Sequence, residues 1–224
     1  MPKSSTIAID GPVAAGKSAV GTQLAIRLGY RFIDTGVMYR ALTWTALRDN
    51  IDPDDEISVT ELAYKTKIDV TNSDSSEGRR IKVDGHDVTD GLRNSDVEHG
   101  VSRVSRFSGV RKAMVARQRE FALQGMLIMA GRDIGTVVLP DADLKIFLTA
   151  SSEERAKRRY REMEQGGQSP KFNLVLEELL HRDKLDTERA NSPLRPADTA
   201  HILNTESIEL DEVVERILNL AEGN

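Results

Sequence analysis

The stretch Gly11–Ser18 constrains this chain more than any other. It reads Gly-Pro-Val-Ala-Ala-Gly-Lys-Ser and fits the pattern G-x-x-x-x-G-K-[ST], directly after an apolar, β-prone run at 7–9. After it, Val20, Leu24 and Leu28 recur at four-residue spacing, which is typical of a helix with one apolar face. Glycines let the backbone curl close to a polyphosphate, and the amides at the start of the helix attract its charge. The stretch therefore predicts a phosphate-binding loop, and nucleotide binding with it, rather than an ordinary glycine-rich turn.

Two side chains at the end of this loop are suited to phosphate chemistry. The Lys17 ammonium can reach the β- and γ-phosphates of a nucleotide, and the Ser18 hydroxyl can ligate Mg²⁺. We therefore expect Mg²⁺ as the cofactor, with Ser18 as its ligand from the protein.

Composition excludes several other classes of function. The chain has 224 residues, enough for one ample core with at most a small insert. Its net charge of −5 argues against a nucleic-acid partner held by bulk electrostatics. The absence of cysteine excludes disulfides and thiol catalysis, and four scattered histidines give little support to a metal site. No apolar run approaches membrane-spanning length, and the first residues form no apolar leader, so we expect a cytoplasmic protein.

Short β-prone runs alternate with helical patterns along most of the chain, which predicts an α/β fold with a parallel sheet. We expect its strands at 7–9, 31–34, 126–130, 144–149 and 200–204. The region from Asn50 to about Asn94 reads differently. Runs at 67–71, 79–83 and 86–89 fit period-two strands, and Asp84-Gly85 is a hairpin signal. We expect a small antiparallel sheet here, inserted into the alternating chain.

Charged residues lie where two of the expected strands end. Arg132 and Asp133 follow the buried run 126–130, and in open α/β sheets ligands bind beyond the carboxyl ends of the strands. The alternative is an Arg–Asp turn on the surface. Arg40 lies just inside the helix that follows strand 31–34, where it can meet an anion or remain a solvated side chain.

A strongly basic helix begins near residue 151. Ser151 and Glu154 fit a capping box, and five cations stand within the seven residues that begin at Arg155. Arg155 and Arg158 share one face of this helix. The break at 165–170 is rich in glycine, so the helix fits a hinged lid over phosphates. Flanking glutamates support the alternative of a salt-bridged, exposed helix.

Together these motifs resemble the nucleoside monophosphate kinases, and most closely the bacterial cytidylate kinases, over essentially the whole chain. The resemblance rests on the segments 9–18, 34–40, 110–119, 131–138, 145–156 and 182–189. The most specific is Gly-Arg-Asp-Ile-Gly-Thr-Val-Val at 131–138, which is no general feature of phosphate-loop proteins.

The resemblance implies a three-layer P-loop kinase fold: a five-stranded parallel sheet, an inserted antiparallel-sheet domain that binds the nucleoside monophosphate, and a helical lid. The implied boundaries are a core of 1–49, 104–150 and 190–224, an insert of about 50–103 and a lid of about 151–189. It also implies a monomer.

The implied reaction transfers the γ-phosphoryl group of ATP to CMP or dCMP, giving ADP and CDP or dCDP, in pyrimidine nucleotide metabolism. The ATP-binding residues it implies are Gly11, Pro12, Val13, Ala14, Ala15, Gly16, Lys17, Ser18 and Ala19. The substrate-binding residues it implies are Thr35, Tyr39, Arg40, Ser102, Arg111, Arg132, Asp133, Arg182, Asp186 and Arg189. The catalytic residues it implies are Lys17, Arg132, Arg155 and Arg158.

The resemblance divides these substrate residues by the part of the acceptor they hold. The acceptor phosphate is assigned to Arg40, Arg132 and Arg189. The cytosine is assigned to Ser102, Arg111 and Asp133. The ribose is assigned to Arg182 and Asp186, and the transferred phosphoryl group to Arg155 and Arg158. Thr35 departs from the family, whose members often carry serine there. It keeps the hydroxyl and adds a methyl group, which leaves the fine geometry at the acceptor phosphate open.

Two alternatives stay open. A kinase for another small acceptor, of the UMP, shikimate or gluconate type, shares the loop and the lid. The shikimate and gluconate types would not need the inserted sheet or the base-reading residues. A slow nucleotide-hydrolysing switch would need guanine-reading motifs such as Asn-Lys-x-Asp, which the sequence lacks. A monophosphate acceptor is already ionised at neutral pH, so the expected chemistry needs no strong general base.

Overall fold

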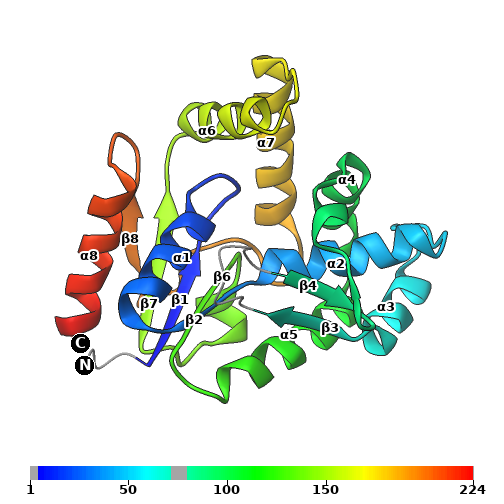
Figure 1. Ribbon diagram of the computed structural model, residues 1–224, viewed down its shortest axis with the longest axis horizontal. Coiled ribbons are helices and arrows are strands. Elements are labelled where there is room, and N and C mark those ends of the chain that lie inside the picture. The colour runs from blue at the N-terminus through cyan, green and yellow to red at the C-terminus, as the bar shows by residue number, and fades with distance from the viewer. Residues whose placement is uncertain (1–4, 72–79, 224) are drawn as a thin grey trace. The chain divides into compact units, whose positions relative to one another are not determined.

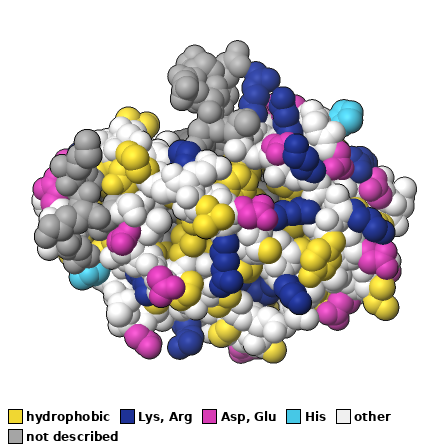
Figure 2. All heavy atoms as spheres, turned by 90° about the horizontal axis from the view of Figure 1, so that it is seen from below, with side chains coloured by type: hydrophobic (Ala, Val, Ile, Leu, Met, Phe, Trp, Pro, Cys, Tyr) yellow, Lys and Arg dark blue, Asp and Glu magenta, His cyan; other side chains and the backbone are white. Residues whose placement is uncertain are grey.

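The computed structural model describes residues 5–71 and 80–223 and shows an α/β chain (Figure 1). The chain divides into two compact units. The phosphate-loop unit consists of the residues up to Tyr30 together with those from Gly125 onward, and the inserted unit is Arg31–Gln124. On the face drawn in Figure 2, acidic, basic and apolar side chains are mixed.

The main sheet has five strands in the order β2-β6-β1-β7-β8, which confirms the expected five-stranded parallel sheet. Its strands are β1 (Thr6–Asp10), β2 (Arg31–Asp34), β6 (Leu127–Gly131), β7 (Leu144–Thr149) and β8 (His201–Asn204). β1 pairs in parallel with both β6 and β7, and β7 pairs in parallel with β8. The carboxyl ends of β1, β6 and β7 therefore meet at one edge of the sheet, where ligands bind in such folds.

Every residue of β6 is buried, as the continuous apolar run predicts. Met126, which the run includes, lies outside the strand and is 51% exposed. Its φ of 46° places it in a left-handed turn, so the chain reverses there before the strand begins.

The helices of the phosphate-loop unit are α1 (Lys17–Leu28), α6 (Ser152–Gln165), α7 (Phe172–Glu188) and α8 (Leu210–Gly223). α1 ends at Gly29, whose φ of 68° is the left-handed conformation expected of a C-terminal glycine. The predicted cap of α6 is confirmed, since the Ser151 hydroxyl accepts a hydrogen bond from the amide of Glu154. α6 and α7 meet at a corner (Figure 1).

The inserted unit is mostly helical. Its elements, besides β2, are α2 (Thr35–Arg48), α3 (Glu56–Lys65), β3 (Ile68–Thr71), β4 (Arg80–Val83), β5 (His86–Asp87), the 3₁₀ helix η1 (Thr89–Arg93), α4 (Ser95–Val104) and α5 (Ser108–Ala122). β3, β4 and β5 form the expected antiparallel sheet.

The small sheet shares the core of the helices in its unit. Ile81 and Val83 alternate inward from β4 and join Met38 and Leu42 of α2 in one buried cluster. β5 is shorter than the predicted run, because Thr89 begins η1 and its hydroxyl accepts a hydrogen bond from the amide of Ile81. In the described ranges, no helix is both long and apolar enough to span a membrane.

Candidate active site

The phosphate loop joins β1 to α1 with an unusual backbone. Gly11 has a φ of 150°, and a Cβ placed on it would lie 2.2 Å from the carbonyl oxygen of Leu148 in β7. Only glycine fits this position without moving the neighbouring strand. Gly16, with a φ of 92°, stands at the start of α1, and Ala14 is left-handed with a φ of 58°. A strained, tightly wound loop before a helix N-terminus is the geometry that binds phosphate.

Lys17 is buried and lies over its own loop. Its ammonium donates a hydrogen bond of 2.6 Å to the carbonyl oxygen of Pro12. The next residue, Ser18, is exposed in the first turn of α1, beside Ala19. The Lys17 ammonium, which is suited to bind nucleotide phosphates, is therefore already held within the phosphate loop.

Arg155 is not an exposed cation of a lid helix, because only 7% of its side chain is exposed. Its guanidinium donates to the carbonyl oxygens of Ala150 at 3.0 Å and of Val13 at 3.2 Å. Its remaining terminal nitrogen lies 2.7 Å from the Asp183 carboxylate of α7. One buried arginine thus connects the start of α6 to the phosphate loop and to α7.

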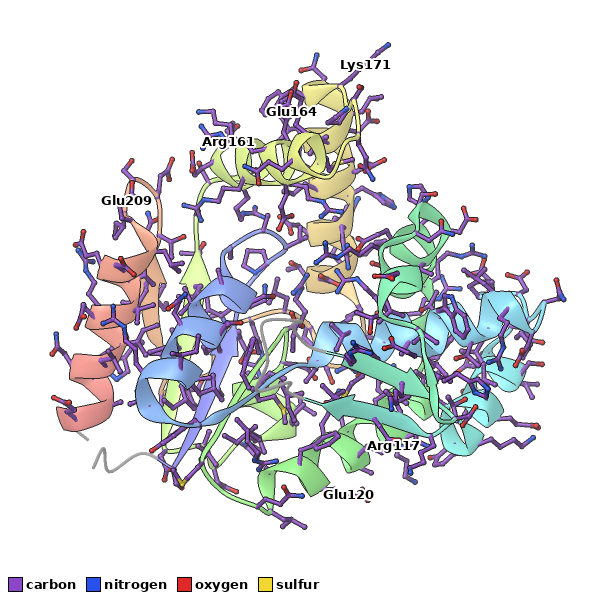
Figure 3. The ribbon with its side chains drawn as sticks, in the orientation of Figure 1. Arg117, Glu120, Arg161, Glu164, Lys171 and Glu209 are labelled. Atoms are coloured by element: carbon purple, nitrogen blue, oxygen red, sulfur yellow. The ribbon has the colours of Figure 1, made fainter. Side chains whose placement is uncertain are left out.

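The other cations of α6 follow the salt-bridged alternative. Arg158 pairs with Glu154 at 3.1 Å, and it also donates to the hydroxyl and carbonyl oxygens of Thr205, at 2.9 and 2.6 Å. Arg161, labelled beside α6 in Figure 3, is exposed. Arg155 is therefore buried in the first turn of α6, Arg158 is half-buried one turn later, and Arg161 is exposed.

Four charged residues form a buried cluster beyond the end of β6. The Nε of Arg132 lies 2.7 Å from the Asp186 carboxylate. Arg189, which caps the end of α7, lies 3.9 Å from Asp186 and 3.7 Å from Asp133. The exposed side-chain fractions run from 7% to 19%. The sequence alternative of a surface Arg–Asp turn is therefore wrong.

The charges of this cluster balance one another. Burial alone would raise the pKa of Asp186, but the guanidinium groups of Arg132, Arg189 and Arg182 bring it below its ordinary value. The carboxylate is therefore ionised at neutral pH, and it holds Arg132 in place by a charge-assisted hydrogen bond. Arg182 is half-buried on α7, one turn before Asp186.

In the inserted unit, Arg40 is held rather than solvated. Its Nε lies 3.0 Å from the Glu98 carboxylate of α4, and the two side chains are 24% and 19% exposed. Thr35 is buried in the first residue of α2, where the Asp34 carboxylate accepts a hydrogen bond from the Gly36 amide and caps the helix.

The remaining candidates of this unit lie on three helices. The Arg111 guanidinium of α5 lies 5.6 Å from the ring centre of Tyr39 in α2, within cation–π range. It also donates to the carbonyl oxygen of Ser105 at 3.3 Å. Ser102 is half-buried on α4, one turn before Ser105.

The predicted residues of the phosphate loop, of the segment after β6, of α6 and of the α7 region lie in the phosphate-loop unit, and those of α2, α4 and α5 lie in the inserted unit. Sequence reasoning missed their acidic partners, Glu98 for Arg40 and Asp183 for Arg155. It also gave no role to Asp10, which lies directly before the loop. Asp183 could have been found, because it stands between two predicted residues of α7. Glu98 carries no such signal, since 58 positions separate it from Arg40.

The donor set fits a magnesium ion that arrives with a nucleotide. Among residues 5–71 and 80–223, no group of three or more histidine, aspartate or glutamate residues could hold a metal ion. The Ser18 hydroxyl is exposed at the start of α1. Mg²⁺ is often bound by few protein ligands together with substrate phosphates and water, and one hydroxyl beside a phosphate loop meets that need.

Comparison with known proteins gives a match along the whole chain. The family model described as cytidylate kinase matches residues 7–223. The chain is 48% identical over 222 residues to a cytidylate kinase of Bacillus velezensis, covering 99% of this chain and 98% of that protein. It is 45% identical over 222 residues to the cytidylate kinase of Bacillus subtilis, with the same coverage. A solved gluconokinase from Sinorhizobium meliloti aligns with a TM-score of 0.51 and 15% identity, covering 100% of this chain and 97% of that one. At that identity the likeness is one of fold alone.

Proposed function

The chain belongs to the cytidylate kinase family, and on this premise we propose that it transfers the γ-phosphoryl group of ATP to CMP or dCMP. The products are ADP and CDP or dCDP. It is an ATP-dependent nucleoside monophosphate kinase by its family, and the match along the whole chain to curated cytidylate kinases carries the choice of acceptor.

On the donor side, the loop from Gly11 to Ala19 binds ATP. Its amides surround the phosphates, and Lys17 exchanges the carbonyl oxygen of Pro12 for the β- and γ-phosphates. Ser18 would hold Mg²⁺ together with the nucleotide, and the ion would supply positive charge at the transferring group. Arg155 and Arg158 add positive charge at the start of α6. The burial of Arg155 against the Val13 carbonyl supports this role, because it keeps a guanidinium at the loop.

On the acceptor side, Arg132 and Arg189 hold the phosphate of CMP, together with Arg40. Asp186 and Asp133 balance the first two arginines before the substrate arrives, which keeps their side chains ordered. A phosphate dianion then competes with these carboxylates for the same guanidinium groups. This exchange frees the two carboxylates for hydrogen bonds to the ribose and the cytosine.

The remaining assignments concern the nucleoside. Asp186 and Arg182 contact the ribose, while Asp133, Ser102 and Arg111 read the base. Thr35 and Tyr39 complete the acceptor site from α2. The acceptor phosphate is ionised, so catalysis consists of alignment, charge neutralisation and exclusion of water, and it needs no general base.

The proposal extends to the arrangement and setting of the chain. Residues of about 151–189 act as a lid and those of about 50–103 as the monophosphate-binding insert, on a core of 1–49, 104–150 and 190–224. The protein works as a cytoplasmic monomer in pyrimidine nucleotide metabolism, with neither a nucleic-acid nor a membrane partner. A net charge of −5 supports the part about nucleic acid.

A coupled ADP-release assay tests the function. Mg-ATP is offered with CMP, dCMP, UMP, AMP, GMP, shikimate and gluconate in parallel. Strong turnover with CMP and dCMP alone supports the proposal. Turnover with another acceptor alone contradicts the base-reading assignments, and slow hydrolysis without any acceptor favours a switch.

The variant Asp133→Ala tests the acceptor site in the same assay. We expect KM for CMP to rise about 10- to 100-fold, because a hydrogen bond to a charged group contributes about 1.5–3 kcal/mol. KM for ATP should stay within about twofold. The same substitution at the exposed Asp141, in the following turn, is the matched control. If both KM values of Asp133→Ala rise equally, Asp133 is not a base reader.

A further inference from the structure

One buried carboxylate of the phosphate-loop unit has no part in the function proposed above. Asp10 is the last residue of β1 and directly precedes Gly11 of the phosphate loop. It is 3% exposed. Its two oxygens accept hydrogen bonds of 2.7 Å from the amides of Ile134 and Gly135. The carboxylate therefore reaches from the end of one strand into the turn that follows another, 124 and 125 positions later.

The turn that Asp10 contacts is a short π-helix, Ile134–Val138. The carbonyl oxygen of Asp133 accepts from the amides of Val137 at 2.9 Å and Val138 at 3.1 Å. The first amides of a helix have no acceptor within it, so those of Ile134 and Gly135 need one from outside. Asp10 supplies that acceptor twice.

The same residue also holds the other end of the turn. In the parallel pairing of β1 with β6, Asp10 is the register partner of Gly131. Arg132 and Asp133 are therefore the two residues between a strand position paired with Asp10 and a helix start bonded to Asp10. Because the residues on both sides of this two-residue segment are attached to Asp10, the segment has little freedom to move relative to β1.

Gly135 shows how closely this contact is built. A Cβ placed on it would lie 3.3 Å from the Asp10 carboxylate oxygen and 3.2 Å from the Cδ of Lys145. Both distances are tighter than ordinary side-chain contacts. A side chain at this position would therefore require the Asp10 carboxylate or the Lys145 side chain to move by a few tenths of an ångström.

The contact is kept at an energetic cost. Burial raises the pKa of Asp10 to about 6, even though the two amides lower it. The Asp133 carboxylate raises this pKa further and the Lys17 ammonium lowers it. A neutral residue at this site would avoid that cost, so packing alone does not account for a carboxylate here.

We infer that Asp10 is a positioning residue that fixes Arg132 and Asp133 relative to the phosphate loop. It touches no substrate atom. It acts by setting where the acceptor phosphate and base are held with respect to the donor phosphates. The part about substrates rests on the proposed function, whereas the clamp itself is a property of the chain.

The variant Asp10→Asn tests the clamp. The amide has nearly the same shape, but its NH₂ group faces a backbone N–H and can accept no hydrogen bond from it. Asp143→Asn is the matched control, because Asp143 accepts from the amides of Ser5 at 2.9 Å and Thr6 at 2.8 Å at the opposite end of β1. Both amides at Asp143 donate to one oxygen, Oδ2, which an asparagine carbonyl can replace, whereas at Asp10 each oxygen accepts from a different amide and asparagine must lose one. The control therefore removes a carboxylate charge beside backbone amides without removing a contact at the site.

Two measurements decide the outcome. In amide hydrogen exchange by NMR, we expect protection of Ile134 or Gly135 to fall at least about tenfold in Asp10→Asn and to be unchanged in Asp143→Asn. In kinetics, we expect Asp10→Asn to raise KM for CMP at least about fivefold, with KM for ATP within about twofold. Unchanged protection overturns the clamp, and an equal rise of both KM values overturns the positioning role.

A second variant covers the case in which Asp10→Asn does not fold. Gly135→Ala leaves Asp10 in place and presses on its carboxylate from the other side. The same shift of KM for CMP alone is expected, and its absence in a folded Gly135→Ala protein overturns the role. If the wild-type enzyme fails to use CMP or dCMP, the proposed function fails, while hydrogen exchange still judges the clamp.

Discussion

Replacing Asp10 by asparagine should change how unfolding depends on pH. Burial raises the pKa of this carboxyl from its ordinary value of 3.8 to about 6 in the folded chain. Between these two values the folded state binds more protons than the unfolded state. The contribution of Asp10 to the free energy of unfolding is therefore fully present below pH 3.8, and it is lost as the pH rises through about 6.

The size of the effect follows from the same two values. The difference between 3.8 and about 6 corresponds to about 3 kcal/mol, at about 1.4 kcal/mol for each pH unit. Asparagine carries no charge at any pH. The free energy of unfolding of Asp10→Asn, minus that of the wild type, should therefore rise by about 3 kcal/mol between about pH 3.5 and pH 7.5.

Urea unfolding of both proteins across this range measures the difference. At any single pH, the difference in the free energy of unfolding also includes the hydrogen bond that the variant loses. Only the change of this difference with pH reports the effect of the buried charge. Asp143→Asn again serves as the control. Burial would raise the pKa of Asp143, but hydrogen bonds from Thr6 and Ser5 lower it overall. The free energy of unfolding of Asp143→Asn, minus that of the wild type, should therefore fall rather than rise with pH. A difference for Asp10→Asn that stays flat or falls with pH refutes the reasoning.

Three further variants test other parts of the structure. Lys17→Met should lower kcat at least about a hundredfold with an unchanged circular-dichroism spectrum, because the lost charge acts on the transferring group; near-normal turnover would remove Lys17 from the mechanism. Asp183→Asn should lower the free energy of unfolding by about 1–3 kcal/mol, measured by urea titration, because Arg155 keeps only a neutral acceptor in place of its buried carboxylate; unchanged stability would show that the pair contributes nothing. Ile217→Ala, at a fully buried position of α8, should cost about 2–5 kcal/mol in the same titration, with kcat and KM unchanged for the enzyme that remains folded; a change in KM would link α8 to the site.

Much of the fold could be predicted because its signals are local. The phosphate loop, the C-terminal glycine of α1 and the cap of α6 each depend on residues a few positions apart. The order of the strands in the sheet was not among these signals. It depends on which apolar faces pack together, and no short window of sequence contains both partners.

In the candidate site too, local sequence signals named the residues, and contacts between distant residues decided their environment. Their place at a strand end named Arg132 and Asp133 as candidates, and the basic helix pattern named Arg155. The alternatives of a surface turn and an exposed helix stayed open. Pairing between distant residues decided between them. Arg132 meets Asp186 across 54 positions, and Arg155 turns inward because Val13 and Asp183 accept its hydrogen bonds.

The sequence by itself predicted a phosphate-binding loop at Gly11–Ser18 and determined that strands alternate with helices. Backbone conformation and apolar periodicity arise from neighbouring residues, so a linear pattern is enough to predict them. Only the tertiary structure decided which charges are buried and which partner balances each. A buried charge is tolerated only beside an opposite charge or a hydrogen-bonding group, and for Asp10 and Arg132 the chain supplies these from far along the sequence.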